Sequence, residues 1–521
     1  MTGQHHTTLR IGIDVGGTNT DAVVLDTDDQ VIAKIKVPTT PDTTTGITNA
    51  VGELCGSNKI DPETITHVMI GTTHATNAIL ERNDLGRVAV VRVGGPATHM
   101  LPPMAQWPED LREVVSAGEI IIPGGTEMDG TDLYPLDVSP LEGFFASLGP
   151  FDSVAVVGVF SPVSNLHELK TRKAVAELVG NDVPIVTSHS VGSIGLIERE
   201  NATILNAALS KVAAQVTEGV RDALISHGIK AVTYFAQNDG TLMSLDYVHR
   251  LPVLTIGSGP ANSMRGAAYL SGLKDAIIVD VGGTSTDVGV LVNGFPRTSA
   301  IPVEIGGVKT NFRMPDLVAI ALGGGTILSG DSGDLCLGPQ SVGYRITEEA
   351  LTFGGNTPTV TDAAMSVGRA DFGRLDPAGD PSFFAEAITR SDAMIADAVD
   401  RVKTTRADQP LVAVGGGNFL VPDGMVGISS THRPDHHDVA NAIGAAIASV
   451  SGHVDRLYDI ADGGRDKALE QARGDAIREA VRLGADPDGT EIVDIEQFNV
   501  LYVATTRLRI RAKAAGPLAA I

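Results

Sequence analysis

Cysteine is nearly absent from this chain: only Cys55 and Cys336 occur among 521 residues. Two cysteines without a CxxC pair form neither a disulfide framework nor a zinc cluster. No Gly-Lys dipeptide occurs either, which excludes the phosphate loop of P-loop nucleotide enzymes. Aromatic residues are also few, with one Trp and seven Tyr. The interior must therefore be built from Ala, Val, Ile and Gly, which suits parallel sheets and closely packed helices.

Basic residues are outnumbered by acidic ones, and the net charge is −24. An acidic surface repels a phosphate backbone, so nucleic acid is not expected as a partner. Residues 1–10 have no apolar signal core, and the most apolar helical candidate, residues 439–450, is too short to span a bilayer. We therefore expect a cytoplasmic protein without a membrane partner. The length predicts two or more domains.

One pattern occurs twice. Residues 11–21 read IGIDVGGTNTD and residues 277–287 read IIVDVGGTSTD. The following apolar segments and turns predict three strands per copy, near 9–15, 20–26 and 31–37 and again near 276–281, 286–292 and 295–300. Two copies of so specific a pattern, each followed by the same predicted strands, indicate a duplicated fold.

The repeat favours phosphate and metal binding. A buried strand that ends in a carboxylate places Asp14 and Asp280 at the edge of a sheet. The Gly-Gly pair permits a tight turn whose amides can approach an anion, and Thr18 and Thr284 add hydroxyl donors. A carboxylate beside a phosphate needs a cation between them, and Mg²⁺ suits these oxygen ligands. The alternative is a glycine-rich hairpin whose Asp caps its own turn, but turn chemistry does not require the pattern twice.

Small-residue helices and glycine runs accompany the repeat. Residues 259–270 and 439–446 predict two helices that can cross closely. The glycine runs at 323–325 and 415–417 follow apolar strands and offer surfaces for a purine or a phosphate. In this order, the motifs resemble the pattern of the actin, heat-shock-chaperone and sugar-kinase superfamily. The resemblance implies an α/β fold of two ribonuclease H-like lobes, with Mg-ATP in the cleft between them.

Longer segments are similar to the hydantoinase/oxoprolinase A family. They include GTTHATNAILER at 71–82, SGPANSMRGAAYL at 258–270, GPQSVG at 338–343 and TVTDAAMSVGR at 359–369, and the similarity runs from about residue 9 to about residue 450. The family implies ATP-dependent opening of hydantoins, 5-oxoproline or lactams, and a separate B-type subunit. This chain departs from the family's larger members because it ends sooner and carries His74 where they usually have an aliphatic residue.

The predicted site follows from the repeat and the resemblance. We expect Asp14 and Asp280 to act in catalysis and near the metal, and His74 to act as a base or to bind substrate. The residues predicted to bind the nucleotide are Gly16, Gly17, Thr18, Asn19, Gly282, Gly283, Thr284, Ser285, Gly323, Gly324, Gly325, Gly415, Gly416, Gly417 and Asn418. For His74 the alternative is a histidine in a helix-capping turn.

Other polar residues have structural alternatives. Glu198 to Glu200 precede a predicted helix at 201–227 and either line the cleft or favour the helix N-terminus. Asp21 and Asp287 are expected at exposed strand positions, where they order the hairpins. His432, His436 and His437 suggest a polar loop that ends in an N-cap at Asp438, because nothing completes a metal site.

We expect three parts: a first lobe at 1–272 with an insertion around 95–150, a second lobe at 273–455, and a C-terminal helix and β extension at 456–521. The predicted function is Mg-ATP-dependent hydrolysis of a cyclic amide, with a companion subunit or a homo-oligomer. Because fold does not fix function, a small-molecule or sugar kinase and a partner-remodelling ATPase remain alternatives.

Overall fold

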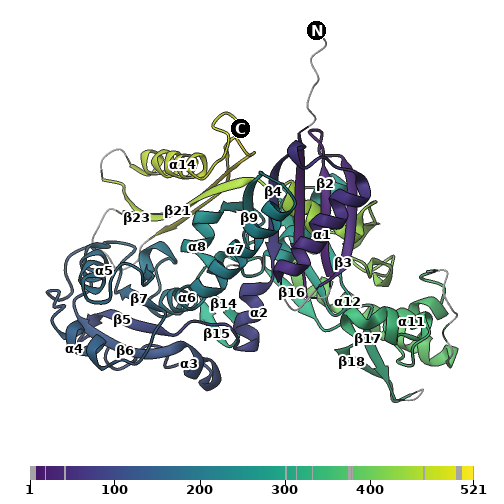
Figure 1. Cartoon of the computed structure of the whole chain (residues 1–521), viewed down its shortest axis with the longest axis horizontal. Helices are drawn as coiled ribbons and strands as arrows, with labels where there is room; N and C mark the ends of the chain where they lie inside the picture. The colour runs from purple at the N-terminus through teal and green to yellow at the C-terminus, as the bar shows by residue number, and fades with distance from the viewer. Residues whose placement is uncertain are drawn as a thin grey trace, which may run out of the picture.

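The computed structural model describes residues 8–17, 19–39, 43–299, 302–312, 314–330, 333–372, 377, 379–461, 464–499 and 507–519. Three larger sheets organise these residues (Figure 1). One carries both ends of the described chain, the second carries the second copy of the repeat, and the third belongs to an insertion. No helix among the described residues is long and apolar enough to cross a membrane.

The first lobe is built on a nine-stranded sheet, in the order β22-β23-β21-β10-β9-β4-β1-β2-β3. Strands β1, β2 and β3, the first three along the chain, match the three strands predicted for the first copy of the repeat. The strands are β1 (Leu9–Val15), β2 (Asn19–Leu25), β3 (Val31–Pro38), β4 (Ile65–Thr72), β9 (Val232–Ala236), β10 (Leu242–Ser244), β21 (Val450–Asp459), β22 (Glu491–Asn499) and β23 (Arg507–Gly516). Because β21 pairs with β10 and β23, the end of the chain returns to the sheet on which it began.

Helices cover this sheet and give it a continuous apolar core. They are α1 (Thr43–Asn58), α2 (His74–Glu81), α6 (Leu196–Ala208), α7 (Ser210–Ser226), α8 (Leu245–Arg250) and the polar C-terminal α14 (Gly464–Arg482). The single helix predicted at 201–227 is therefore wrong: α6 begins earlier, and the chain breaks at Leu209 before α7. Small alanines of α14, such as Ala472 and Ala476, are fully buried against β21 and β23.

The second lobe contains the second repeat. Its sheet has the order β13-β12-β11-β19-β20, with β16 paired to β12. The strands are β11 (Ala276–Val281), β12 (Thr286–Val292), β13 (Phe295–Pro296), β16 (Leu317–Ile320), β19 (Gln409–Val414) and β20 (Ile428–His432). The third strand predicted at 295–300 is wrong in length, since β13 ends at Pro296 and β16 takes the next positions along β12. Helices α11 (Val360–Ser366) and α12 (Pro381–Val402) pack on this lobe.

The insertion has its own four-stranded parallel sheet, in the order β6-β5-β7-β8. It is composed of β5 (Val88–Gly95), α3 (Glu109–Val115), β6 (Ser116–Pro123), α4 (Pro140–Ser147), β7 (Ser153–Gly158), α5 (Leu166–Val179) and β8 (Ile185–Thr187). Figure 1 places these elements at the lower left, away from α11 and α12. Two short hairpins, β14–β15 (Val303–Ile305, Val308–Thr310) and β17–β18 (Thr326–Ser329, Cys336–Ser341), complete the described strands.

Two helices cross closely between the lobes, as the small-residue segments predict. They are α9 (Ser258–Ser271) and α13 (Ala440–Ala446). A Cβ atom on Gly266 would lie 1.8 Å from the carbonyl oxygen of Ala440, and one on Gly444 would lie 1.9 Å from that of Asn262. Only glycine permits this approach at the two positions. The contact joins the two halves of the molecule directly beside the repeated turns.

Candidate functional site

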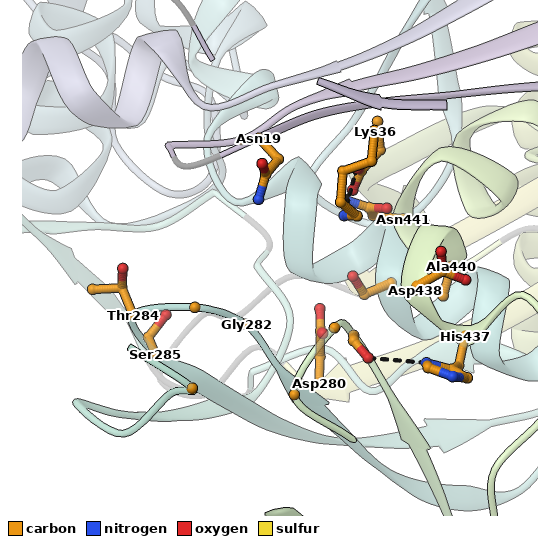
Figure 2. Close-up of a pocket in the computed structure, with 18 of the residues that line it drawn as sticks. Asn19, Lys36, Asp280, Gly282, Thr284, Ser285, His437, Asp438, Ala440 and Asn441 are labelled. Atoms are coloured by element: carbon orange, nitrogen blue, oxygen red, sulfur yellow. Dashed lines mark hydrogen bonds and ion pairs between the residues drawn. The ribbon is translucent and has the colours of Figure 1, made fainter. Parts of the chain in front are cut away.

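A pocket of about 330 Å³ lies between the two repeated turns (Figure 2). The first turn contributes Gly16, Gly17 and Asn19, and the second contributes Gly282, Gly283, Thr284 and Ser285. Both turns close in the same way, because the Gly16 amide donates to the Asn19 carbonyl (3.0 Å) and the Gly282 amide to the Ser285 carbonyl (2.9 Å). The duplicated sequence thus forms duplicated turns that face one cavity. Thr18 lies outside the described residues.

Three glycine amides that line this pocket have no acceptor among the described residues. They belong to Gly17, Gly283 and Gly416, one from each turn and one from the glycine run after β19. Backbone amides that point into a cavity without an internal acceptor are suited to bind phosphate oxygens. The pocket therefore contains donors on opposite walls for one anionic ligand.

The glycine run at 323–325 has a different arrangement. Its three amides are used internally: Gly323 donates to Thr326 Oγ1, Gly324 to the Gly282 carbonyl and Gly325 to the Gly283 carbonyl. Only Gly324 lines the pocket. This run therefore supports the second turn from behind. That arrangement leaves Gly323 and Gly325 no free amide for a nucleotide.

Asp14 belongs to a charge network at the end of β1. Its cross-strand partner is Asp21 on β2, and the Asn441 side chain donates to both carboxylates, at 2.9 and 3.0 Å. Asn262 donates to Asp14 at 3.3 Å, and the Lys36 ammonium lies 2.5 Å from Asp21. Burial, followed by repulsion from Asp21, raises the pKa of Asp14 to about 6. The prediction that Asp21 occupies an exposed position is wrong, since it is only 4% exposed.

Asp280 occupies the equivalent place on β11, opposite Asp287 on β12. Burial raises the pKa of Asp280, and a hydrogen bond from the Ser263 hydroxyl opposes that shift. Burial and the neighbouring Asp280 raise the pKa of Asp287 to about 7. No basic side chain among the described residues pairs with Asp287. Lys36 thus contacts only the first carboxylate pair directly, and it acts on Asp280 from a distance.

A glycine beside each leading carboxylate makes room for it. Gly71 on β4 is in register with Asp14, and a Cβ atom there would lie 2.2 Å from Asp14 Oδ1. Gly415, directly after β19, would place a Cβ atom 2.3 Å from Asp280 Oδ1. Both lobes therefore accommodate the aspartate with a glycine from the neighbouring parallel strand or directly after it. The identical role of Gly71 and Gly415 is not apparent from the DVGGT pattern itself.

The site fits Mg²⁺ held together with a phosphate. Among the described residues, no cluster of three His, Cys, Asp or Glu side chains could hold a metal alone. Mg²⁺ does not need such a cluster, since it is commonly bound by one or two carboxylates, waters and phosphate oxygens. Asp14 and Asp280 are buried carboxylates whose charges repel one another, and a divalent cation would relieve that repulsion.

The opposite end of the pocket is partly aromatic. Phe372 and Phe419 line it and contact each other edge to face, with ring centroids 5.4 Å apart. Together with Gly416 they offer an apolar surface on which a purine could rest. Asn418 does not line the pocket; it is 7% exposed and begins a short 3₁₀ helix (Asn418–Leu420). Of this segment, the three glycines and Phe419 line the pocket.

His74 lies outside this pocket, at the first position of α2. The Thr72 hydroxyl accepts from the His74 amide (3.2 Å) and lies 2.5 Å from His74 Nδ1, so the capping interaction comes from Thr72. His74 lines a separate small cavity of about 20 Å³ with apolar neighbours such as Val212 and Phe235. Because Thr72 pairs with Val15, this cavity begins one strand away from the first DVGGT turn.

The Glu198–Glu200 segment has structural roles in α6. Glu200 forms a buried ion pair with Arg92 of β5, at 2.5 Å. The fully buried Arg199 donates to Ser188 and to the Gly158 carbonyl. Both contacts join α6 to the insertion, and none of these three residues lines the pocket between the turns.

The contacts of Asp438 and His437 also differ from those expected from the sequence. Asp438 pairs with Lys34 of β3 at 2.6 Å, and α13 begins at Ala440 without a side-chain cap, so the predicted N-cap at Asp438 is wrong. His437 lines the pocket, and its Nδ1 lies 3.0 Å from the Gly415 carbonyl. Lys36 and Asn441, like Phe372 and Phe419, are among the pocket residues that the sequence did not indicate. A lysine on a strand and an asparagine in a small-residue helix have no motif of their own.

Two family profiles match this chain over most of its length. The one described as Hydantoinase/oxoprolinase N-terminal region matches residues 10–179, and the one described as Hydantoinase/oxoprolinase matches residues 199–409. The acetophenone carboxylase gamma subunit of Aromatoleum aromaticum is 29% identical over 392 residues, covering 69% of this chain and 53% of that protein. The caprolactamase subunit alpha of Pseudomonas jessenii is 28% identical over 404 residues, covering 70% and 55%.

This chain spans about half the length of these curated relatives. Among solved structures, the ATP-dependent caprolactamase from Pseudomonas jessenii superposes with a TM-score of 0.75 at 20% identity, covering 98% of this chain and 89% of that chain. A likeness at this identity establishes the fold. The predicted α/β architecture with two lobes is thereby confirmed.

Proposed function

We propose that this chain, which belongs to the hydantoinase/oxoprolinase family, binds Mg-ATP between its two DVGGT turns and uses it to open a cyclic amide. The observation that carries the proposal is the symmetry of the pocket. Each wall offers a free glycine amide, from Gly17 or Gly283, close to a buried aspartate. This combination suits a polyphosphate together with a divalent cation.

The reaction needs activation because an amide is stabilised by resonance and its amine is a poor leaving group. Transfer of the γ-phosphoryl group to the carbonyl oxygen makes the carbon electrophilic. One water then breaks the C–N bond and a second releases the phosphate. The net reaction converts a cyclic amide, ATP and two waters into an amino acid, ADP and phosphate. Because phosphoryl transfer depends on positioning and charge neutralisation, the protein supplies mainly these two effects.

Different residues of the pocket would provide the positioning and the charge neutralisation. When bound, Mg²⁺ would neutralise charge between the phosphates and the carboxylates of Asp14 and Asp280. The free amides would hold phosphate oxygens, and Lys36, the lysine of the pocket, would add a positive charge beside them. Asn441 keeps Asp14 and Asp21 in a fixed orientation. Phe372 and Phe419 would contact the purine.

The cyclic amide would enter beside His74. The small apolar cavity there adjoins Thr72, one strand from the first turn, and at about 20 Å³ holds no more than one water, so the ring would lie outside it, against His74. His74 could then position the amide or accept a proton from the attacking water. We expect His74→Ala to lower turnover about 10²-fold or more, while the affinity for ATP changes little. Equal losses in turnover and ATP affinity, or no loss of either, would mean that His74 has a purely structural role.

The test is ADP release from Mg-ATP, measured alone and with hydantoin, 5-oxoproline, caprolactam, a sugar and a polyol. Stimulation by one of the cyclic amides, with a ring-opened product identified by mass, is the expected result. A stable phosphorylated sugar or polyol would instead establish a kinase. If the rate of ADP release is unchanged by every compound and rises only when a protein is added, the chain would be a remodelling ATPase.

A second candidate function comes from the relative with a carboxylase name. The acetophenone carboxylase gamma subunit matches this chain about as well as the caprolactamase subunit does. The same pocket could phosphorylate an oxygen bonded to carbon in a ketone-derived substrate. Adding ketones with bicarbonate to the ADP-release panel separates the two. Stimulation by a ketone and bicarbonate, without any response to cyclic amides, would favour carboxylation.

A companion subunit is part of the proposal. Both relatives are named as subunits. We therefore propose that full activity requires a second polypeptide. Co-expression with a B-type subunit is expected to raise substrate-dependent ADP release. A chain that opens the ring at full rate by itself would remove this part of the proposal.

A further inference from the structure

A second cavity, of about 410 Å³, lies where three distant parts of the chain meet. Its lining comes from the segment after β8 (190–193), the β9–β10 turn (237–239), α8, β21, α14 and β23. Figure 1 shows α14 and β21 above α8, next to the insertion. This cavity shares no lining residue with the pocket between the DVGGT turns. It is therefore a separate place for a ligand.

The cavity contains a buried amide without a partner. Asn238 is 2% exposed, and its Nδ2 has no hydrogen-bond acceptor among the described residues. On another wall, Asn311 Oδ1 is likewise buried without a donor, although its Nδ2 donates to the Ser193 carbonyl at 3.1 Å. An unsatisfied buried polar group destabilises the folded chain. A ligand that accepts from Asn238 would remove that cost.

Positively charged side chains outnumber negatively charged ones around the cavity. Each of its three acidic residues already has a cation: Asp239 has Lys513 at 2.9 Å, Asp455 has Arg509 at 2.7 Å, and Glu479 has Arg482 at 2.6 Å. Although burial would raise the pKa of Asp239, Lys513, His453 and the Thr241 hydroxyl hold it well below its usual range. Asp239 therefore stays ionised and paired, and does not repel an incoming anion.

Two arginines at the rim remain without an acidic partner. Arg250 and Arg456 line the cavity and form no ion pair with any described residue. Both act on Glu479 from a distance, together with its partner Arg482. In a chain with a net charge of −24, a pair of unneutralised guanidinium groups above a cavity is a local exception. Guanidinium groups bind carboxylates with charge-assisted hydrogen bonds.

We propose that this cavity binds a small dicarboxylate, with one carboxylate at Arg250 and Arg456 and the other end accepting from Asn238. A volume of about 410 Å³ holds on the order of a dozen waters at about 30 Å³ each, which is ample for a chain of four or five carbons. Since the ligand would contact α8, β21 and the β9–β10 turn together, it would link these three elements of the first lobe.

The experiment is calorimetric titration of the full chain with succinate and with glutarate, without nucleotide. Each neutral diamide, succinamide and glutaramide, serves as the control ligand. We expect one dicarboxylate to bind saturably at one site per chain, while its diamide binds at least tenfold more weakly. Raising the ionic strength should weaken binding, because the rim arginines are exposed.

Two variants test where the dicarboxylate binds, and a third is the control. The double variant Arg250→Gln, Arg456→Gln should weaken binding about tenfold or more, and Asn238→Ala should weaken it about tenfold. Because the described structure gives the Asn238 side chain no partner, this variant should not lower the melting temperature. Arg401→Gln, at the exposed end of α12, is the matched control and should bind as the wild type does. The proposal is overturned if neither dicarboxylate saturates, if the diamides bind equally well, or if the rim and Asn238 variants behave like Arg401→Gln.

Discussion

The two DVGGT hairpins share their backbone but differ in charge. Both turns close with the same hydrogen bond, and both leading aspartates lie against a glycine, which is Gly71 on β4 for Asp14 and Gly415 directly after β19 for Asp280. In the first hairpin, Lys36 and Asn441 bind the carboxylates of Asp14 and Asp21. In the second hairpin, the pKa of Asp287 is raised to about 7 by burial and by Asp280, and no cation of the described residues opposes the shift.

This difference shows how a duplicated fold can become asymmetric. The first carboxylate pair carries its own neutralising lysine, so it can hold its geometry without a ligand. The second pair has no cation in contact with it among the described residues, although Lys36 acts on Asp280 from a distance, so this pair gains more from a bound cation. We therefore expect the metal to compensate mainly the second hairpin. Four predictions test the comparison, from the largest expected effect to the smallest.

The leading aspartates should be equally essential. We expect Asp14→Asn and Asp280→Asn each to lower Mg-ATP turnover by about 10²–10³-fold, since each removes a charge that faces the phosphates and the metal. Circular dichroism should show an intact fold. Asp397→Asn, on the exposed face of α12, is the control. Full activity in both aspartate variants would contradict the two-hairpin site.

The neighbouring glycines should be unequal. A methyl group on Gly71 or Gly415 would push into the adjacent aspartate, and such overpacking costs about 1–3 kcal/mol of stability. Gly415 also has a φ of +85°, so alanine there adds about 1–2 kcal/mol of backbone strain. Turnover should fall in both variants, and the melting temperature should fall further in Gly415→Ala. Gly143→Ala, whose added methyl group would meet no atom within 4 Å, is the control. Unchanged activity in both would show that the aspartates can move freely.

Lys36 should matter more than a lysine outside the pocket. Removing a charged hydrogen-bond donor from the pocket in Lys36→Met should weaken ATP binding about tenfold or more. Lys467→Met, at an exposed position of α14 that does not line the pocket, is the control. Calorimetry with a non-hydrolysable ATP analogue makes the comparison. Equal losses in the two variants would mean that Lys36 does not act on the phosphates directly.

Asp287 should make the nucleotide-free protein sensitive to pH. Its pKa is about 7 when folded, against an ordinary value of 3.8. Between these values the folded chain holds a proton that the unfolded chain has released, so the free energy of unfolding falls as pH rises from about 4 to about 7. Asp287→Asn should remove this loss and raise the melting temperature by about 1–3 °C at pH 8, with less effect at pH 5. Equal shifts at both pH values would contradict the assignment.

Sequence patterns predicted the local elements of the fold and the place of the turns. The strands of the first hairpin, both small-residue helices and the polar C-terminal helix agree with the structure. These features depend on short-range rules: apolar strand segments, glycine turns and small residues at a helix crossing. The break at Leu209 and the shortened third strand at Pro296 were missed, because tertiary packing decides them.

The remaining site residues could not be predicted, because they depend on long-range contacts. Asn441 reaches Asp14 across 427 positions of sequence, and Phe372 meets Phe419 from a different segment. No local pattern marks either pair. The glycine run at 323–325 shows the opposite problem: its pattern resembles a phosphate-binding turn, yet its amides are used to hold the second hairpin.

The most direct test of the two-hairpin site is calorimetric titration of the wild-type chain with a non-hydrolysable ATP analogue, with and without Mg²⁺. We predict one nucleotide per chain, with an affinity raised about tenfold or more by Mg²⁺, and loss of that increase in both Asp14→Asn and Asp280→Asn. Nucleotide binding that is indifferent to Mg²⁺, or that keeps its Mg²⁺ dependence in both variants, would contradict the account.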